Sequence, residues 1–217
     1  MSNISQCFRS EDVEVKSRKS IHEGFCSVKE YEIRQKYFND EWSEVYSREL
    51  IAKPKAVAAL PYDPKLDKVV LIEQLRVGAI DMAERHEMDT PWLIEIIAGI
   101  VDDDDEKSHK DKIRREIFEE TGLYTEALLH MYDYFTTPGC STERIELFCA
   151  RVDSNKAKQF AGLKEEHEDI KVHVVSTEEA FLALRSGQIN NAAAIIALQW
   201  LDLNMNVVNQ QWGIEVL

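Results

Sequence analysis

No stretch of this sequence is apolar over the roughly 18 residues that a membrane-spanning helix needs. Residues 1–12 are polar and lack the apolar segment of a secretory signal. Positive charge is also scarce, because 26 Lys and Arg residues stand against 40 Asp and Glu, which gives a net charge of −14. A surface of this sign without a basic cluster repels the phosphate backbone of nucleic acids. We therefore expect neither a membrane nor a nucleic acid among the partners of the chain.

Cysteine is rare, and its spacing excludes the common metal-binding and redox motifs. The four residues are Cys7, Cys26, Cys140 and Cys149. They form no C-x-x-C pair, so a zinc site is not expected, and the pattern favours reduced thiols in a cytoplasmic protein. The histidines lack the H-E-x-x-H spacing of a zinc protease, and we expect them on the surface or in loops.

The composition predicts a folded protein with a full hydrophobic core. With 217 residues, of which 44% are hydrophobic, the chain is long enough for one large domain and a small appended element. Residues 13–51 have the apolar spacing of strands, and Asn39-Asp40 supplies a turn between two of them. Three strands without a covering helix are marginally stable alone. We therefore divide the chain into an N-terminal antiparallel β element (1–52), which packs on the rest or on another copy, and a main domain (53–217).

The main domain alternates between predicted strands and helices. Val69-Val70-Leu71-Ile72 is a continuous apolar run, typical of a strand buried on both faces. Strands are expected at 55–62, 68–75, 91–97, 127–136, 143–152 and 170–175. Helices are expected between Ser176 and Gly187 and at 192–201, and loops at 78–90 and 160–169. This order predicts an α/β (α+β) fold, in which a mixed sheet lies between one helix and the C-terminal helices as an α/β/α sandwich.

The acidic segment that ends at Gly122 carries the most information about function. Read as a helix, it places Glu116 and Glu120 four positions apart, where their side chains are neighbours and repel each other. Glu119 adds a third carboxylate, and Arg115, four positions before it, can hold it by a charge-assisted hydrogen bond. A hard cation such as Mg²⁺ would explain the cluster, because it binds carboxylate oxygens. The alternative is a solvent-exposed acidic face in an acidic protein.

This segment resembles the second half of the Nudix box, the signature R-E-U-x-E-E-x-G-U of the Nudix hydrolases, in which U is aliphatic. The specified positions are all filled, by Arg115, Glu116, Ile117, Glu119, Glu120, Gly122 and Leu123. The first half departs from the signature, because the distance from Gly99 to Arg115 is two residues longer than in the family. The first acidic position of the box is therefore displaced onto Asp105 or Glu106.

The resemblance runs from about Phe25 to Asn204 and looks close to the ADP-ribose pyrophosphatase branch of the family. Pro138 follows Leu123 by fifteen residues, and a proline at this place is the family mark of ADP-ribose specificity. The resemblance implies hydrolysis of ADP-ribose to AMP and ribose 5-phosphate with Mg²⁺, or with Mn²⁺ in its place. Two alternatives stay open: hydrolysis of another nucleoside diphosphate sugar such as GDP-mannose, and a non-catalytic sensor that binds a nucleotide sugar.

The resemblance also implies which residues act on the diphosphate. The implied metal ligands are the backbone carbonyl of Ala98 and the carboxylates of Glu116, Glu119, Glu120 and Glu168. We assign Glu166 as the base that takes the proton of the attacking water, although the sequence does not decide between it and Glu168. Glu116, Glu120 and Arg115 complete the catalytic set, with Arg115 steadying Glu119. The alternative for residues 165–169 is an ordinary solvated loop.

A further set is implied for the rest of the substrate. Phe25 would stack on the adenine, Arg48 would bind the diphosphate or the base side, and Arg76 would reach a phosphate. Glu143, in the segment after Pro138, would accept a hydrogen bond from a ribose hydroxyl. In the family the N-terminal β element is swapped across a homodimer and contributes base contacts, so we expect the same homodimer here.

Overall fold

The computed structural model describes residues 4–101 and 108–214, and the chain separates into two compact units. The smaller unit consists of Met1–Pro54 and Phe135–Glu143, and the larger unit of Lys55–Tyr134 and Arg144–Leu217. Each unit is described by itself below. Asp105 and Glu106, expected to replace the first acidic position of the signature, lie outside the described residues.

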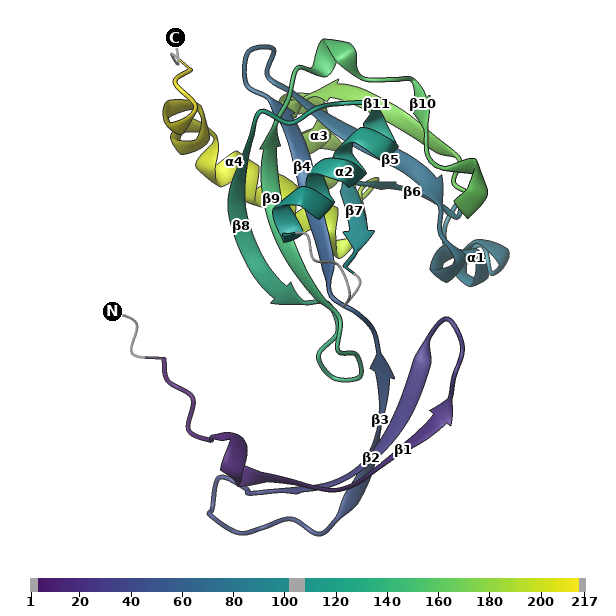
Figure 1. Cartoon of the computed structure of the whole chain (residues 1–217), viewed down its shortest axis with the longest axis vertical. Helices are drawn as coiled ribbons and strands as arrows, with labels where there is room; N and C mark the ends of the chain where they lie inside the picture. Colours follow the sequence, from purple (N-terminus) through teal and green to yellow (C-terminus); the bar gives the residue numbers. More distant parts are fainter. Residues whose placement is uncertain (1–3, 102–107, 215–217) are drawn as a thin grey trace. The chain divides into compact units, whose positions relative to one another are not determined.

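The smaller unit is built on a three-stranded antiparallel sheet in the order β1-β2-β3 (Figure 1). Its elements are the short 3-10 helix η1 (Ser10–Asp12) and the strands β1 (Val13–His22), β2 (Ser27–Gln35) and β3 (Tyr46–Ala52). The expected meander is therefore present. The segment 135–143 joins this unit because Thr142 makes two hydrogen bonds to the backbone of Lys53, each 2.8 Å long.

The larger unit contains an eight-stranded sheet. Six of its strands lie in the order β10-β11-β5-β4-β9-β8, and the other two are β6, which pairs with β5, and β7, which pairs with β4. Its strands are β4 (Ala56–Asp63), β5 (Lys68–Leu75), β6 (Trp92–Glu95), β7 (Ile97–Ile100), β8 (Ala127–Phe135), β9 (Arg144–Arg151), β10 (Phe160–Ala161) and β11 (Ile170–Ser176). β4 pairs with β9 in parallel and with β5 and β7 antiparallel, so the sheet is mixed, as predicted.

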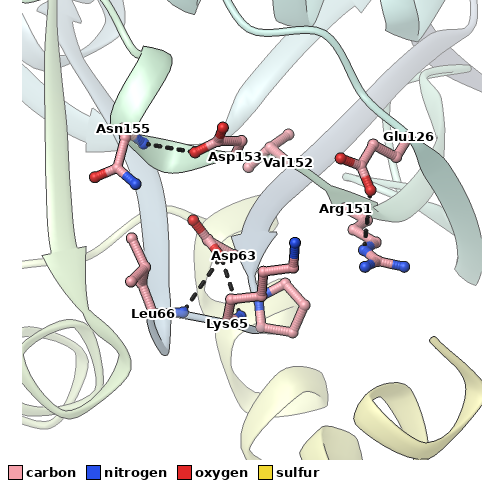
Figure 2. Close-up of a pocket in the computed structure, with 9 residues that line it drawn as sticks. Asp63, Lys65, Leu66, Glu126, Arg151, Val152, Asp153 and Asn155 are labelled. Atoms are coloured by element: carbon pink, nitrogen blue, oxygen red, sulfur yellow. Dashed lines mark hydrogen bonds and ion pairs between the residues drawn. The ribbon is translucent and has the colours of Figure 1, made fainter. Parts of the chain in front are cut away.

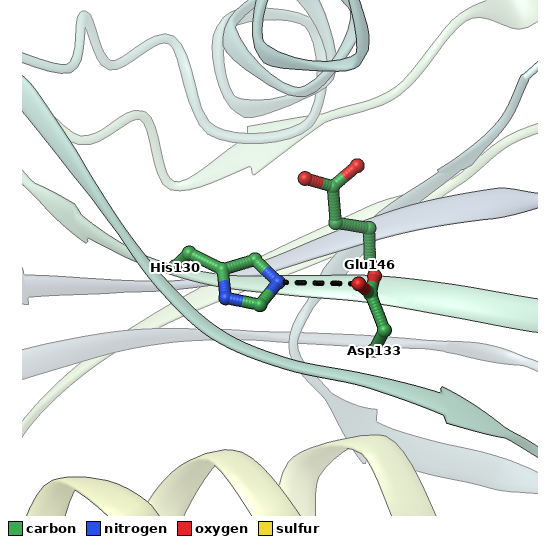
Figure 3. A group of neighbouring side chains, drawn as sticks. All are labelled: His130, Asp133 and Glu146. Atoms are coloured by element: carbon green, nitrogen blue, oxygen red, sulfur yellow. Dashed lines mark ion pairs between the residues drawn. The ribbon is translucent and has the colours of Figure 1, made fainter.

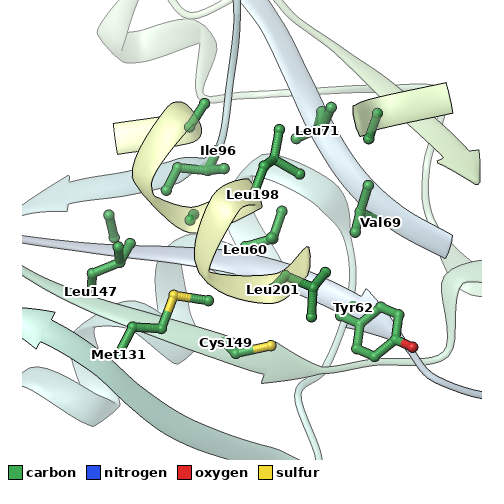
Figure 4. Packing of buried hydrophobic residues seen from close by; sticks show 14 of the residues in the cluster. Leu60, Tyr62, Val69, Leu71, Ile96, Met131, Leu147, Cys149, Leu198 and Leu201 are labelled. Atoms are coloured by element: carbon green, nitrogen blue, oxygen red, sulfur yellow. The ribbon is translucent and has the colours of Figure 1, made fainter. Parts of the chain in front are cut away.

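Helices cover both faces of this sheet (Figure 1). The helical elements are α1 (Val77–Glu84), α2 (His109–Thr121), η2 (Ser154–Lys156), η3 (Lys164–Glu166), α3 (Thr177–Arg185) and α4 (Ala192–Gln211). On one face, α3 and α4 enclose a core that includes Leu60, Met131, Leu198 and Leu201 (Figure 4). Within the described ranges, none of the helices has the length and apolar character needed to cross a membrane.

On the other face, α2 packs its apolar side onto the sheet. Ile113 and Ile117 of the helix are fully buried with Val57, Ile72 and Phe148 of three different strands. Alternate residues of the central strands therefore serve two separate cores, which is why these strands are continuous apolar runs. This arrangement confirms the predicted α/β/α sandwich.

Three details differ from the sequence prediction. Residues 77–84 form α1, although 78–90 was expected to be a loop, and this helix buries only Ala79, so it lacks a strong apolar pattern. The strand expected at 91–97 is divided into β6 and β7, which pair with different neighbours. α4 continues ten residues past Leu201, because Val208 is buried and Asn209 accepts a hydrogen bond from the Tyr62 hydroxyl at 3.2 Å.

Candidate active site

Both ends of the helix α2 are fixed by capping interactions. The hydroxyl of Ser108 caps the first turn by accepting a hydrogen bond from the N–H of Asp111. Gly122 ends the helix with a φ of 74°, a conformation that glycine adopts without strain. Between these ends, Glu120 lies among the buried residues of the helix, beside Ile117. The helix therefore directs at least one carboxylate away from solvent.

Glu120 is the most unusual of these acids. Only 4% of the residue is exposed, and its Oε2 atom has no hydrogen-bond partner among the described residues. Burial raises the pKa of Glu120 well above its ordinary value, and the charges of Glu116 and Glu168 raise it further. The charge of Arg76 and a hydrogen bond from the Ala98 backbone act in the opposite direction. Four of the residues predicted to act on the diphosphate thus surround Glu120 closely enough to interact with it.

The carboxylate of Glu116 occupies space that only a glycine leaves open. A β-carbon built at Gly99 would overlap the carboxyl group of Glu116, so this position of β7 excludes every larger residue without a shift. On the other side, the ammonium of Lys112 lies 2.6 Å from Glu116 Oε1, and both side chains are nearly buried. Lys112 was not predicted, although its position four residues before Glu116 is the spacing of a helical ion pair.

The predicted contact between Arg115 and Glu119 is looser than expected. The Nε atom of Arg115 lies 4.0 Å from Glu119 Oε1, which is an ion-pair distance and too long for a hydrogen bond. Both side chains are partly exposed, unlike those of Glu116 and Glu120. The geometry places Arg115 where it can steady Glu119 electrostatically.

The loop between β10 and β11 brings a fourth carboxylate to the site. Glu168 accepts a hydrogen bond from the N–H of Leu163 at 3.2 Å, and its charge acts on Glu120. Gly162, with a φ of 98°, lies close to the backbone of Glu168. A β-carbon built at Gly162 would lie 2.9 Å from the backbone oxygen of Glu168. The backbone of Glu166 lies in η3, but its side chain is outside what the structure describes. The assignment of Glu166 as the base stays a prediction.

Arg76 is the cation that the fold places near the buried acid. It lies at the end of β5, just before α1, and its Nε donates a 2.7 Å hydrogen bond to Glu95 Oε2. Glu95 is mostly buried, so it fixes the guanidinium while leaving other N–H groups of Arg76 available. This contact, which the sequence prediction missed, holds the Arg76 guanidinium where its charge acts on Glu120; its binding to phosphate stays a prediction.

The residues of this site fit a hard divalent cation. Glu120 contributes a buried oxygen without a partner, and Glu116 and Glu168 add carboxylates whose charges reach it. An unpaired buried carboxylate is costly, and coordination by a cation would remove that cost. The donors that the prediction assigned are all oxygens, which is the set that Mg²⁺ and Mn²⁺ prefer.

The other predicted substrate residues belong to the smaller unit. Phe25 is 96% exposed, and the Arg48 guanidinium stacks on the Tyr46 ring at 4.5 Å. Glu143 accepts a 2.9 Å hydrogen bond from the Thr136 hydroxyl, and Pro138 lies in the turn that follows Thr136. Their roles in binding substrate stay predictions.

A hollow at the turn between β4 and β5 is unrelated to this site (Figure 2). It encloses about 260 Å³, and Asp63 at its base accepts hydrogen bonds from the N–H groups of Lys65 and Leu66 and from Ser154. These bonds close the turn, so Asp63 has a structural role. None of the predicted site residues lines the hollow.

Comparison with known proteins agrees with this geometry. The ADP-ribose pyrophosphatase of Haemophilus influenzae is 44% identical over 214 residues, which cover 98% of this chain and 95% of that protein. The ADP-ribose pyrophosphatase of Escherichia coli K12 is 39% identical over 211 residues, which cover 97% and 98%. The GDP-mannose pyrophosphatase of Cronobacter sakazakii is 35% identical over 159 residues, which cover 73% and 78%.

A crystal structure of an ADP compounds hydrolase superposes with a TM-score of 0.67 over 96% of this chain and 99% of that one. At 16% identity this likeness shows the fold alone. The family model of the NUDIX domain matches residues 52–198, which include β4 to the middle of α4 and all the acids around Glu120. The chain belongs to the NUDIX family.

Proposed function

We propose that this chain hydrolyses the pyrophosphate bond of ADP-ribose and releases AMP and ribose 5-phosphate. The observation that carries the proposal is the near full-length identity of 39–44% to proteins named ADP-ribose pyrophosphatase. The buried acid Glu120, with Glu116 and Glu168 around it, supplies the matching chemistry. The enzyme is a hydrolase of a phosphoric anhydride.

We assign the metal of this reaction as Mg²⁺, with Mn²⁺ as a substitute. The residues that would hold it are the Ala98 carbonyl and the carboxylates of Glu116, Glu119, Glu120 and Glu168. Such an ion polarises phosphoryl oxygens and lowers the pKa of a bound water. The all-oxygen donor set and the unpartnered Oε2 of Glu120 favour this choice.

The side chains of the protein position the substrate and remove a proton from the attacking water. Arg76, fixed by Glu95, binds a phosphate oxygen of the substrate through its remaining N–H groups. Glu166 takes the proton of the attacking water, and Arg115 stabilises Glu119 during the reaction. A base must lie within hydrogen-bond reach of the water before its pKa matters, so Glu168 is the second candidate for this role.

We further propose that the N-terminal β element (1–52) completes the substrate site of a homodimer, while residues 53–217 form the hydrolase domain. Three observations support this: the element forms a separate sheet, it exposes Phe25 almost fully, and it carries Arg48 stacked on Tyr46. Light scattering of the purified protein should give twice the mass of 25.0 kDa. A monomer that is fully active at nanomolar concentration would refute the swapped dimer.

The location and the excluded partners complete the proposal. The four cysteines are free thiols, which favours a cytoplasmic protein. The net charge of −14 disfavours binding to nucleic acid. Cell fractionation and a DNA-binding assay at low salt are the corresponding measurements.

The activity is tested by incubating the purified protein and Mg²⁺ with ADP-ribose, GDP-mannose and other nucleoside diphosphate sugars. We expect kcat/KM to be highest for ADP-ribose, because specificity is a ratio of these values. Glu120→Gln should lose most of the rate, whereas Glu178→Gln, on an exposed position of α3, should retain it. A higher kcat/KM for GDP-mannose would favour the first alternative, since a GDP-mannose pyrophosphatase is also related. Tight binding of ADP-ribose without product would favour the sensor.

A further inference from the structure

A second group of ligand-type side chains lies at the start of α2, outside the acidic cluster (Figure 3). His130 and Asp133 come from β8 and Glu146 from β9, and one donor atom of each lies within 4.8 Å of the other two. His109, the first residue of α2, is seven positions before Glu116, or about 10 Å along the helix axis. The two groups are therefore separate.

The donor atoms of this second group are close but not satisfied by one another. His130 Nε2 lies 3.7 Å from Asp133 Oδ2, which is beyond hydrogen-bond distance. Around a zinc-type ion with bonds of about 2.1 Å, neighbouring ligand atoms lie about 3.0–3.5 Å apart. The side chain of Asp133 is about half exposed, so it has room to rotate and bring its donor oxygen closer to the other two.

Two features hold the group in place. The imidazole Nδ1 of His109 lies 2.5 Å from Glu146 Oε2, so this carboxylate is held by a hydrogen bond. The His130 ring packs edge-on against the buried Phe148 ring at 5.8 Å, which limits its rotation. A hollow of about 220 Å³, lined by His109, Asp133 and Glu146, opens the group to solvent.

We propose that His130, Asp133 and Glu146 form a second divalent-cation site, selective for zinc-class ions, with His109 orienting Glu146. An imidazole with two carboxylates suits Zn²⁺ and its neighbours, whereas Mg²⁺ prefers oxygen donors alone. A hydrogen bond from a neighbouring side chain to a ligating carboxylate is the usual support of such sites. The bound ion ties β8 to β9 and, through His109, to the first turn of α2. The residue spacing gave no hint of the site, because Glu146 lies on a different strand from His130 and Asp133.

Cu²⁺ distinguishes the two sites, since the second includes the imidazole of His130, whereas the ligands assigned to the first are all oxygens. With one equivalent of Cu²⁺, pulsed electron paramagnetic resonance of the full chain should show imidazole nitrogen coupling. Zn²⁺ binding is measured in parallel by calorimetry. His130→Asn should remove the nitrogen coupling and weaken the second Zn²⁺ affinity at least tenfold, and His109→Gln about tenfold. His86→Asn is the matched control, because His86 is an exposed histidine outside the group.

Asp133→Asn gives an independent reading if His130→Asn folds poorly, and circular dichroism in EDTA checks both variants. Both should hydrolyse ADP-ribose with Mg²⁺ at the wild-type rate, so failure of the proposed activity would not be confused with failure of this site. The site is overturned if His130→Asn and Asp133→Asn bind Zn²⁺ as tightly as the wild type. It is equally overturned if the nitrogen coupling persists in His130→Asn.

Discussion

Replacement of Glu120 by Gln should separate the destabilising effect of the buried carboxylate on the fold from its contribution to activity. Glutamine keeps the size of the side chain and removes the charge, while the surrounding Glu116 and Glu168 are unchanged. In the absence of metal, the wild-type protein buries Glu120 at 4% exposure next to two other carboxylates, and this environment opposes its ionisation. We therefore expect Glu120→Gln to be more stable than the wild type at pH 7 in EDTA, although it is nearly inactive.

The pH dependence of unfolding gives the size of this difference in stability. Since the pKa of Glu120 is raised in the folded state, the unfolded chain releases this proton first as the pH rises. The contribution of Glu120 to the free energy of unfolding is then highest below the pKa of glutamate in the unfolded chain, near 4.3. It falls as the pH rises, until the pH passes the pKa of Glu120 in the folded protein. One group changes the free energy of unfolding by at most about 1.4 kcal/mol per pH unit, so the loss between pH 5 and pH 7 is up to about 2.7 kcal/mol. Glutamine does not titrate, so the difference between the two proteins isolates Glu120.

The assay is urea unfolding of both proteins at pH 5, 6 and 7, first in EDTA and then with saturating Mg²⁺. The gap in favour of Glu120→Gln should widen with pH in EDTA. Mg²⁺ at a hundredfold excess over its Kd should raise the stability of the wild type by about 2.7 kcal/mol and that of the variant by much less. Glu178→Gln should follow the wild type throughout. A gap that stays constant or narrows with pH would refute the reasoning that folding raises the pKa of Glu120.

Three further predictions follow from single contacts. Gly99→Ala should displace the Glu116 carboxylate and lower Mg²⁺-dependent turnover at least tenfold; unchanged turnover would mean that the overlap is relieved without effect. Lys112→Met should weaken activation by Mg²⁺ roughly tenfold, because the ammonium that holds the Glu116 carboxylate is lost. Lys110→Met, at an exposed position, should not weaken it. Identical Mg²⁺ activation curves for the two variants would exclude a role of Lys112 in holding Glu116. Asp63→Ala should lower the free energy of unfolding by about 2–4 kcal/mol in urea with kcat retained, and a loss of activity at full stability would contradict its structural role.

The elements that sequence could predict are those whose signals are local. The strands β4, β5, β9 and β11 follow apolar patterns that reflect burial, and α3 begins where Ser176 and Glu179 form a capping box. The end of α2 at Gly122 is also a local feature, because it depends only on the last turn of the helix and on the positive φ of this glycine. For these elements, the chain carries the physical cause within a few residues.

Features that depend on distant partners escaped prediction. α1 exposes most of its residues, so no apolar stripe marked it, and the division of β6 from β7 depends on which strands they pair with. The contacts of Arg76 with Glu95 and of Glu116 with Gly99 join separate strands or a strand and a helix. The sequence named most members of the site through their resemblance to a family, but it could not show which of them is buried.

The burial of Glu120 favours one of the two explanations that the acidic helix allowed. A solvent-exposed acidic face would leave Glu120 in water, where a carboxylate is stable and needs no partner. The fold instead buries Glu120, leaves Oε2 without a hydrogen bond among the described residues, and sets Glu116 and Glu168 near it. Each of these features opposes ionisation, so the arrangement is unfavourable for the isolated chain at neutral pH. A cation bound to these carboxylates would offset the cost of burial and the repulsion between the acids, and this is the physical reason to propose metal binding rather than solubility as the role of the helix.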